Sequence, residues 1–255
     1  MSAREPVLRV EELRYRYPDG RDGLRGVSFR IDAGEKVALA GANGAGKSTL
    51  LTNLNGVWRG TGRILLDGAE LGPSTLAQLR RRVGLVFQDP DDQLFCPTVR
   101  EDVAFGPLNQ GLPTEAVDRR VAEALELVGL LGFEDRSPFH LSLGEKKRVA
   151  IATVLACEPT IILMDEPSSE LDPRHRRDLI RWLQACQRTL LIATHDLELA
   201  LEVCSRCLVL ADGRVRADGP CRQVLGDEAL MDATGLEIPL SLKLGLTGAP
   251  EDTKV

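Results

Sequence analysis

The chain has 255 residues, 43% hydrophobic and 27% charged, which is the balance of an ordinary folded protein. Its 24 glycines and 14 prolines are near average usage and exclude collagen-like and low-complexity classes. The net charge of −6 disfavours a general nucleic-acid binder, and the sequence has no apolar run long enough to span a membrane. Met1 to Val10 lack the basic start and apolar run of a secretory signal, so we expect a cytosolic chain.

Short apolar runs alternate with longer helical patterns, which predicts an α/β fold with helices on the faces of a sheet. Turn-forming residues at 17–20 separate the first two expected strands. The expected strands are 7–13, 27–31, 36–40, 63–66, 83–87, 160–164, 189–193 and 207–210, and the clearest helices are 47–55, 116–128, 173–186 and 197–204.

The middle of the chain, residues 97 to about 156, is mostly helical in pattern. We interpret residues 89–156 as a helical insertion within an α/β body that spans 1–225. Asp212 and Gly213 separate two β-like runs and predict a hairpin turn. Residues 226–255 are expected to form a C-terminal extension, with a short helix at 227–234 and a frayed end at 248–252.

Six cysteines are scattered along the chain, and only Cys204 and Cys207 form a CxxC pair. A zinc site would require a second pair at matching spacing, whereas the nearest further cysteine is Cys221. We therefore expect ordinary buried thiols.

Residues 41–48 read Gly-Ala-Asn-Gly-Ala-Gly-Lys-Ser and match the phosphate-binding pattern GxxxxGK[ST] at every fixed position. An apolar strand precedes the motif and a helix follows it. Its backbone N–H groups would surround phosphate oxygens, Lys47 would reach the β- and γ-phosphates, and Ser48 would coordinate Mg²⁺. The alternative is a glycine-rich turn that binds nothing, which the complete match disfavours.

A second motif is the acid pair Asp165 and Glu166, which follows the apolar run 161–164. Asp165 is expected where a parallel strand ends beside the phosphate loop, in a position to hold Mg²⁺. Glu166 could polarise the attacking water. Two solvated acids at a strand end are the alternative, which the preceding phosphate loop disfavours.

With these motifs, residues 7–225 resemble the ATPase subunit of ATP-binding-cassette (ABC) transporters. The signature segment of that family is matched by Leu-Ser-Leu-Gly-Glu at 141–145, which precedes the strand of the acid pair. In the family this segment contacts the γ-phosphate bound to the other subunit. The resemblance thus implies a P-loop NTPase fold with a mixed sheet and an antiparallel N-terminal part, and a head-to-tail dimer completed by Ser142, Gly144 and Glu145.

Further positions are assigned by this resemblance one at a time. Tyr17 would stack on adenine, with Tyr15 as the alternative, and Gln88 would bind Mg²⁺ and water. Asp172, within a segment that resembles the D-loop, would reach the opposite subunit, and His195 resembles the switch histidine near the γ-phosphate. The expected ATP ligands are Tyr17, Asn43, Gly44, Ala45, Gly46, Lys47, Ser48, Thr49, Ser142, Gly144, Glu145 and Asp172; the catalytic set is Glu166, His195 and Gln88; the Mg²⁺ set is Ser48, Gln88 and Asp165.

Two positions depart from the family pattern. Leu143 replaces the usual first glycine of the signature, and we infer that this position has a negative φ. Ser169 and Glu170 stand where the family has two small residues, and Glu170 could alter contacts between subunits. Both departures leave the hydrolysis rate open.

Residues 86–99 and 101–109 are most similar to the energy-coupling-factor importers, and within them to the cobalt and nickel ATPase. This implies a peripheral motor on the cytoplasmic face of the membrane. A transmembrane subunit would dock near residues 88–95, and Phe95, Asp91 and Asp92 are the candidates for contacting it. The alternative is that the two acids belong to a solvated loop without a partner. A metal-binding membrane subunit would be an indirect partner.

The cargo assignment depends wholly on resemblance, since the sequence has three histidines and no cluster with nickel or cobalt ligand spacing. A vitamin such as biotin is the alternative. A cassette acting on nucleic acid or ribosomes is disfavoured by the single cassette and the acidic charge, so we expect no nucleic-acid partner. A module without turnover is disfavoured by Glu166, Gln88 and His195 occurring together.

Overall fold

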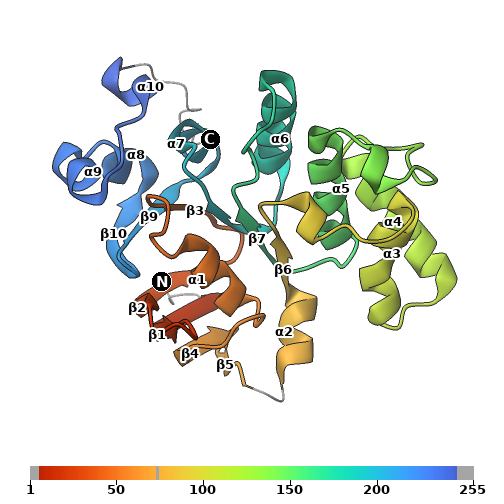
Figure 1. Cartoon of the computed structure of the whole chain (residues 1–255), viewed down its shortest axis with the longest axis horizontal. Coiled ribbons are helices and arrows are strands. Elements are labelled where there is room, and N and C mark those ends of the chain that lie inside the picture. The colour runs from red at the N-terminus through yellow and green to blue at the C-terminus, as the bar shows by residue number, and fades with distance from the viewer. Residues whose placement is uncertain (1–5, 73–74, 246–255) are drawn as a thin grey trace, which may run out of the picture.

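The computed structural model describes residues 6–72 and 75–245, which form two sheets and the helices that cover them (Figure 1). The antiparallel sheet has the order β2-β1-β4-β5 and consists of β1 (Leu8–Arg16), β2 (Asp22–Ile31), β4 (Thr61–Leu66) and β5 (Ala69–Glu70). The central sheet has the order β10-β9-β3-β8-β7-β6 and consists of β3 (Lys36–Ala40), β6 (Val83–Val86), β7 (Ile161–Asp165), β8 (Thr189–Ala193), β9 (Arg206–Ala211) and β10 (Arg214–Pro220). Its strands are parallel except β10, which confirms the predicted mixed sheet.

Three helices form a lobe between β6 and β7, beside the rest of the chain in Figure 1. They are α3 (Val99–Asn109), α4 (Thr114–Leu127) and α5 (Leu143–Leu155), and they confirm the predicted helical insertion. The remaining helices are α1 (Lys47–Leu54), α2 (Leu76–Arg82), α6 (Pro173–Ala185), α7 (Leu197–Val203), α8 (Cys221–Leu225), α9 (Glu228–Thr234) and α10 (Leu240–Lys243).

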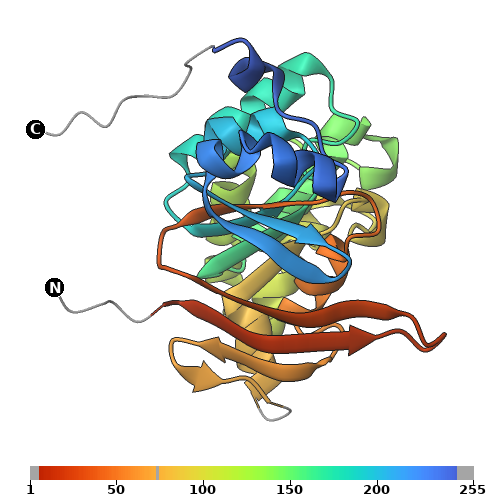
Figure 2. The same ribbon diagram turned by 90° about the vertical axis from the view of Figure 1, so that its left-hand side faces the viewer.

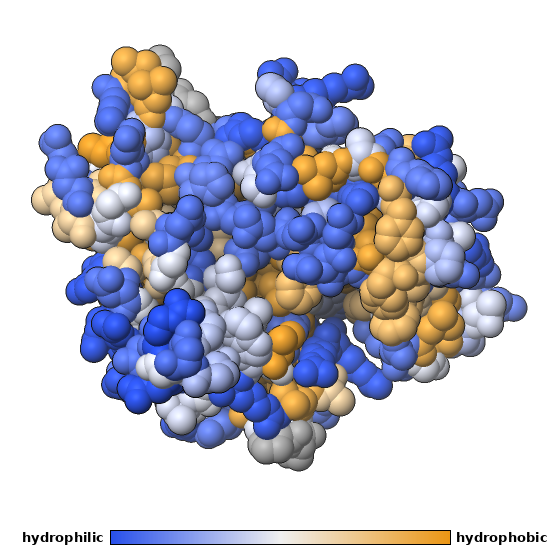
Figure 3. All heavy atoms as spheres, viewed as in Figure 1, coloured by the Kyte–Doolittle hydropathy of each residue, from blue (hydrophilic) through white to orange (hydrophobic). Residues whose placement is uncertain are grey.

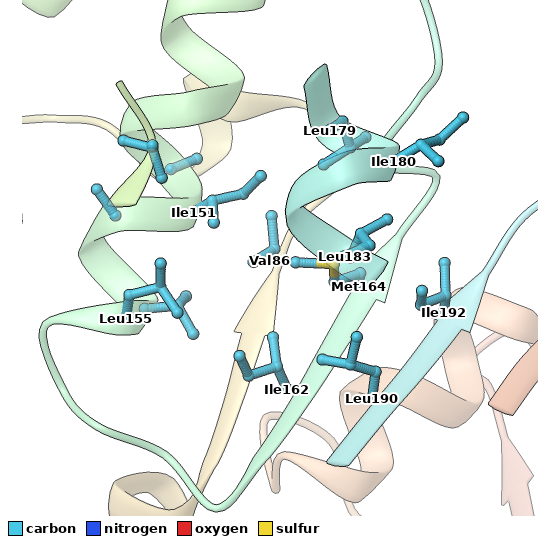
Figure 4. Close-up of a cluster of buried hydrophobic side chains, with 14 of the residues drawn as sticks. Val86, Ile151, Leu155, Ile162, Met164, Leu179, Ile180, Leu183, Leu190 and Ile192 are labelled. Atoms are coloured by element: carbon cyan, nitrogen blue, oxygen red, sulfur yellow. The ribbon is translucent and has the colours of Figure 1, made fainter. Parts of the chain in front are cut away.

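The parallel strands of the central sheet are buried on both faces, which is why they read as continuous apolar runs, whereas β10 at the edge alternates exposed and half-buried residues. Ile161 and Leu163 of β7 pack in the cluster that contains the antiparallel sheet and α1. Ile162 and Met164 face the opposite way, into the cluster with α5 and α6 (Figure 4). Figure 2 shows the resulting order of layers: antiparallel sheet, central sheet, helices.

Strand register brings the predicted motifs to one edge of the central sheet. Ala193 of β8 pairs with Leu39 of β3 on one side and with Asp165 of β7 on the other. The loops that follow these three parallel strands therefore start side by side, which is where open α/β sheets place ligands. These loops carry the phosphate-binding motif, Glu166 and His195.

The hairpin predicted at Asp212 and Gly213 connects β9 and β10, with φ of 51° and 70° at the two residues. The short elements α2, β5, α8 and α10 were missed because they are too short for a periodic pattern. Of the residues Met1 to Val10, for which we expected no secretory signal, Leu8, Arg9 and Val10 begin strand β1. Residues 1–5 and the predicted frayed end at 248–252 lie outside the described residues.

All six cysteines are free, but only Cys204, Cys207 and Cys221 are buried as predicted, whereas Cys96, Cys157 and Cys186 are half-buried. Across residues 6–72 and 75–245 no group of three or more His, Cys, Asp or Glu side chains could hold a metal ion. In the same ranges no helix combines the length and the apolar character needed to cross a membrane.

Candidate active site

The phosphate loop depends on glycine at specific positions. Gly44 and Gly46 have φ of 81° and 107°, which side chains with a Cβ rarely adopt. A Cβ on Gly41 would lie 2.4 Å from the Leu210 carbonyl oxygen, so this backbone approaches β9 too closely for any other residue. Gly46 is the N-cap of α1 and provides no side-chain cap, which leaves the first N–H groups of α1 for an anion.

The loop borders a cavity of about 530 Å³, within the usual range for small-molecule sites. Most of the residues predicted for one nucleotide site line it together. They are Tyr17, Asn43, Gly44, Gly46, Lys47, Ser48, Thr49, Gln88, Asp165, Glu166 and His195, with Arg21, Asp22 and Gly23 as further lining residues. Ala45 instead is buried, and its carbonyl accepts a hydrogen bond from the Gly213 N–H at 3.1 Å.

Glu166 is held by three contacts from two residues, His195 and Lys47. Its Oε2 lies 2.7 Å from Nδ1 of His195 and accepts the His195 backbone N–H at 3.1 Å. Its Oε1 lies 3.5 Å from Nζ of Lys47. Only 6% of the Glu166 side chain is exposed, whereas 63% of His195 is, so the histidine covers the carboxylate at the solvent edge.

The backbone at Glu166 is also unusual, with φ of 47° in the left-handed region. Its N–H donates to the Ala193 carbonyl at 2.8 Å, which ties the end of β7 to β8. Residues other than glycine adopt this conformation mainly where surrounding contacts enforce it, and such sites cluster in active centres.

Lys47 is buried beneath the loop, 7% exposed, and its Nζ donates to the Gly41 carbonyl at 2.8 Å. Together with the 3.5 Å approach to Glu166, this places a cation between the loop and the carboxylate. The same Nζ can offer its remaining donor capacity to phosphate oxygens entering the cavity.

Asp165 and Ser48 fit the predicted Mg²⁺ ion. Oδ1 of Asp165 is buried and has no hydrogen-bond partner among the residues that the structure describes. Burial raises the pKa of Asp165, and the Ser48 hydrogen bond and the Lys47 charge only partly oppose that effect. A buried orphan carboxylate oxygen beside a hydroxyl is the oxygen-donor set that Mg²⁺ prefers, and Gln88 lines the same cavity.

Of the two tyrosines, Tyr17 is the one that lines the cavity, and its hydroxyl hydrogen bonds with Oγ1 of Thr49. Tyr15 stacks on Trp58, with ring centroids 5.3 Å apart and an interplanar angle of 6°. Tyr17 also meets both of these rings edge to face, with centroids 5.2 and 5.7 Å away, so its place in the cavity wall is what makes it the candidate for adenine.

The signature residues lie outside this cavity, at the start of α5. Ser142 is the N-cap, and its Oγ accepts the Glu145 N–H at 3.4 Å while donating to Oε2 of Glu145 at 2.8 Å. The Ser142 N–H also donates to Oε2 at 2.8 Å, so the two residues form a capping box. The bonds from Ser142 hold the pKa of Glu145 below its ordinary value.

Leu143 is the first residue of α5 and is not among the positive-φ residues, as inferred from the sequence. Gly144 packs against α6, where an added Cβ would lie 3.2 Å from Nδ1 of His175. Asp172 caps α6 by accepting the N–H groups of Arg174 and His175 at 2.9 and 3.0 Å. Asp172 thus lies outside the cavity of its own chain, and its role toward a second copy stays a prediction.

Residues 24–169 match the family model described as ABC transporter. The chain is 51% identical over 238 residues to a putative ABC transporter ATP-binding protein of Geobacter sulfurreducens, covering 93% of this chain and 96% of the relative. The chain belongs to the ABC transporter family. It is an ATPase cassette, as the phosphate loop and the acid pair predict.

Other relatives are similar along nearly the whole cassette. The energy-coupling factor transporter ATP-binding protein EcfA of Methanothermobacter thermautotrophicus is 45% identical over 259 residues, covering 98% of this chain and 83% of the relative. CbiO1 from Clostridium perfringens, part of the ABC transporter complex CbiONQ, superposes with a TM-score of 0.79 at 38% identity, over 95% of this chain and 100% of that one. The ATP-binding cassette MJ0796, solved as a dimer in a post-hydrolysis state bound to ADP and Pi, superposes with a TM-score of 0.75 at 29% identity. The match covers 84% of this chain and 98% of that one.

Two positions in the cassette were not singled out from the sequence. Lys147 is buried, and its Nζ donates to Oγ and the carbonyl of Ser169. Arg176 on α6 donates to both oxygens of Asp196, the residue after His195, at 2.6 and 3.0 Å. Helical spacing offered a signal for Lys147, because positions 144, 147 and 151 share the buried face of α5.

Proposed function

We propose that this cassette is the ATP-hydrolysing motor of an energy-coupling-factor importer for cobalt or nickel ions. The observation that carries the motor role is Glu166, a buried carboxylate held by His195 and Lys47 at the mouth of the phosphate loop. The importer class is supported by similarity to EcfA and to CbiO1. A vitamin importer with the same motor is the alternative, because cargo choice would lie in other chains.

In the proposed mechanism the protein mainly positions and neutralises charge. The N–H groups of the loop and Nζ of Lys47 bind the phosphates, and Tyr17 stacks on adenine. Glu166 accepts a proton from the attacking water while His195 holds the carboxylate in place. Ser48, Gln88 and Asp165 would hold Mg²⁺, which supplies positive charge to the phosphate oxygens.

We propose that two copies form a head-to-tail dimer. The observation that supports it is the division of the predicted site within one chain. Ser142, Gly144 and Glu145 lie at the start of α5, outside the cavity that contains Lys47. A second copy would bring its own α5 to this cavity, where the helix N-terminus suits a phosphate charge.

We also propose that a transmembrane subunit docks on the helical lobe near residues 88–95. Figure 3 shows hydrophobic side chains gathered on this lobe. Phe95 is 60% and Phe105 49% exposed, and their rings meet edge to face with centroids 5.0 Å apart. Of the two acids beside them, Asp91 pairs with Lys146 at 2.6 Å, and Asp92 is exposed. An apolar helix from a partner would bury these rings.

The test is purification of the tagged chain from detergent-solubilised membranes of its native cell. Recovery of a transmembrane scaffold with a metal-binding membrane subunit supports the proposal, while vitamin-binding subunits would replace the cargo. Phe95→Asp should reduce recovery, whereas Leu240→Asp, an exposed leucine on α10, should not. Recovery without any membrane protein would contradict the importer role and the location on the membrane.

A further inference from the structure

Lys147 is a buried cation whose hydrogen bonds all go to one short segment. Its Nζ donates to the Ser169 carbonyl at 2.6 Å, to Ser169 Oγ at 2.7 Å and to the Glu166 carbonyl at 3.4 Å. An ammonium group has three donors, so these bonds use its full capacity. Because an unpaired buried ammonium is costly, Lys147 and segment 166–169 hold each other in a fixed arrangement.

The two ends of this connection have different tasks. Lys147 lies one turn beyond the capping box that starts α5, so it moves with Ser142 and Gly144. Segment 166–169 begins with Glu166, whose carboxylate faces the cavity of its own chain. Ser169 Oγ also donates to the Glu166 carbonyl at 2.9 Å, which closes a small ring of hydrogen bonds.

The opposite side of the segment is bound to the residue after the switch histidine. Ser168 Oγ donates to Oδ2 of Asp196 at 3.2 Å, and the same carboxylate accepts both bonds from Arg176. The segment is therefore held between α5 on one side and the loop of His195 on the other. The bonds of Lys147 connect α5 directly to segment 166–169. Movement of α5 relative to the loop of His195 would therefore strain these bonds.

We propose that Lys147 is a positioning residue that couples the two nucleotide sites of the dimer. The inference rests on the proposed dimer, in which the start of α5 meets the nucleotide held by the second copy. A nucleotide there would shift α5, and Lys147 would transfer the shift to the main chain of Glu166, which acts on the nucleotide of its own chain. Occupancy of one site thereby adjusts the carboxylate of the other.

The experiment compares Lys147→Met with Lys36→Met in the full chain, using ATP hydrolysis as a function of ATP concentration. Lys36 is a matched control because its Nζ also donates to a carbonyl, that of Gln184 at 2.6 Å, from the start of β3. Lys147→Met should lower kcat about 10- to 100-fold through misplacement of Glu166. Its Hill coefficient should fall toward about 1, whereas Lys36→Met should keep that of the parent.

Three further measurements separate coupling from simple loss of structure. ATP affinity of the monomeric variant, measured by calorimetry, should equal that of the parent. Lys147→Arg should recover part of the Hill coefficient, since a guanidinium can still reach the Ser169 oxygens. If Lys147→Met does not fold, Ser169→Ala removes one acceptor and should lower the Hill coefficient by a smaller amount.

A parent enzyme with a Hill coefficient near 1, or a Lys147→Met variant that keeps the parent's coefficient, would overturn the coupling. Failure of the parent to hydrolyse ATP or to dimerise with nucleotide would instead overturn the proposed function. The two failures are thus distinguishable in one set of measurements.

Discussion

The cavity at the phosphate loop and the start of α5 are both rich in polar groups, but they treat those groups differently. In the cavity, Oδ1 of Asp165 has no hydrogen-bond partner among the described residues, and Gly46 leaves the start of α1 uncapped by a side chain. At α5, Ser142 and Glu145 satisfy each other through a capping box. One region is arranged for a ligand within a single chain, while the other is complete as a helix end.

This difference indicates how a composite site can be built from one sequence. A cavity with unsatisfied groups gains more from a ligand, because the cost of their burial has already been met by the fold. The start of α5 already satisfies its own polar groups, so it can attract a phosphate only through its helix dipole and the few N–H groups that stay free. Its contribution to ATP binding should therefore be smaller and should appear only in the dimer. Substitutions in the two regions test this ranking.

Glu166→Gln should have the largest effect. The amide keeps the size of the side chain but cannot accept the proton of the attacking water, so hydrolysis should fall about 10²- to 10⁴-fold. ATP binding should persist and a nucleotide-bound dimer should accumulate, as measured by phosphate release and by size-exclusion chromatography with ATP. Hydrolysis at the parent rate would show that another group acts as the base.

Ser142→Ala should have the next effect, and Thr98→Ala is its matched control. Both residues are N-caps in capping boxes, Ser142 with Glu145 and Thr98 with Glu101. Each variant should lose about 0.5–2 kcal/mol of unfolding free energy in denaturant titrations. Only Ser142→Ala should also slow hydrolysis at saturating ATP; equal slowing in both variants would mean that α5 acts through stability alone.

Asp196→Asn tests the carboxylate that holds segment 166–169. Burial raises the pKa of Asp196, but hydrogen bonds from Arg176, the Leu199 N–H and Ser168 outweigh it and hold the pKa below its ordinary value. The stabilisation by the carboxylate is therefore fully present above the ordinary pKa and is lost as the pH falls through the lowered one. At neutral pH the variant should lose about 1–3 kcal/mol of unfolding free energy.

The difference between Asp196→Asn and the parent should shrink as the pH falls below about 4. Denaturant titrations at neutral and acidic pH measure it. A difference that stays constant with pH would show that the hydrogen-bond geometry matters and the charge does not.

Leu143→Pro should have the smallest effect. Leu143 is the first residue of α5, where proline's fixed negative φ and missing N–H are both tolerated. The variant should therefore fold and hydrolyse ATP at close to the parent rate, with Leu143→Gly as the comparison that restores the family's usual residue. Unfolding of the proline variant alone would show that this position requires another backbone conformation.

The sequence predicted the cavity better than its surroundings. Lys47, Asp165 and Glu166 were found because each is bound to a local pattern, a glycine-rich loop or the end of an apolar strand, and parallel strands end together. The partners of Lys147 and of Asp196 lie about 20 residues away in the chain and on other elements, so no local pattern names them. Ala45 was assigned to ATP by its place in the motif; its side chain is buried, and its contact with ATP stays a prediction.

The left-handed backbone at Glu166 separates two properties that usually change together. The hydrogen bonds at this turn include several to the main chain alone, because the N–H is bound to Ala193 and the carbonyl to Lys147 and Ser169. Aspartate and asparagine tolerate such a backbone better than most residues do. If Glu166 is the base we propose, substitutions at this one position would change turnover while leaving the path of the main chain and the nucleotide cavity in place.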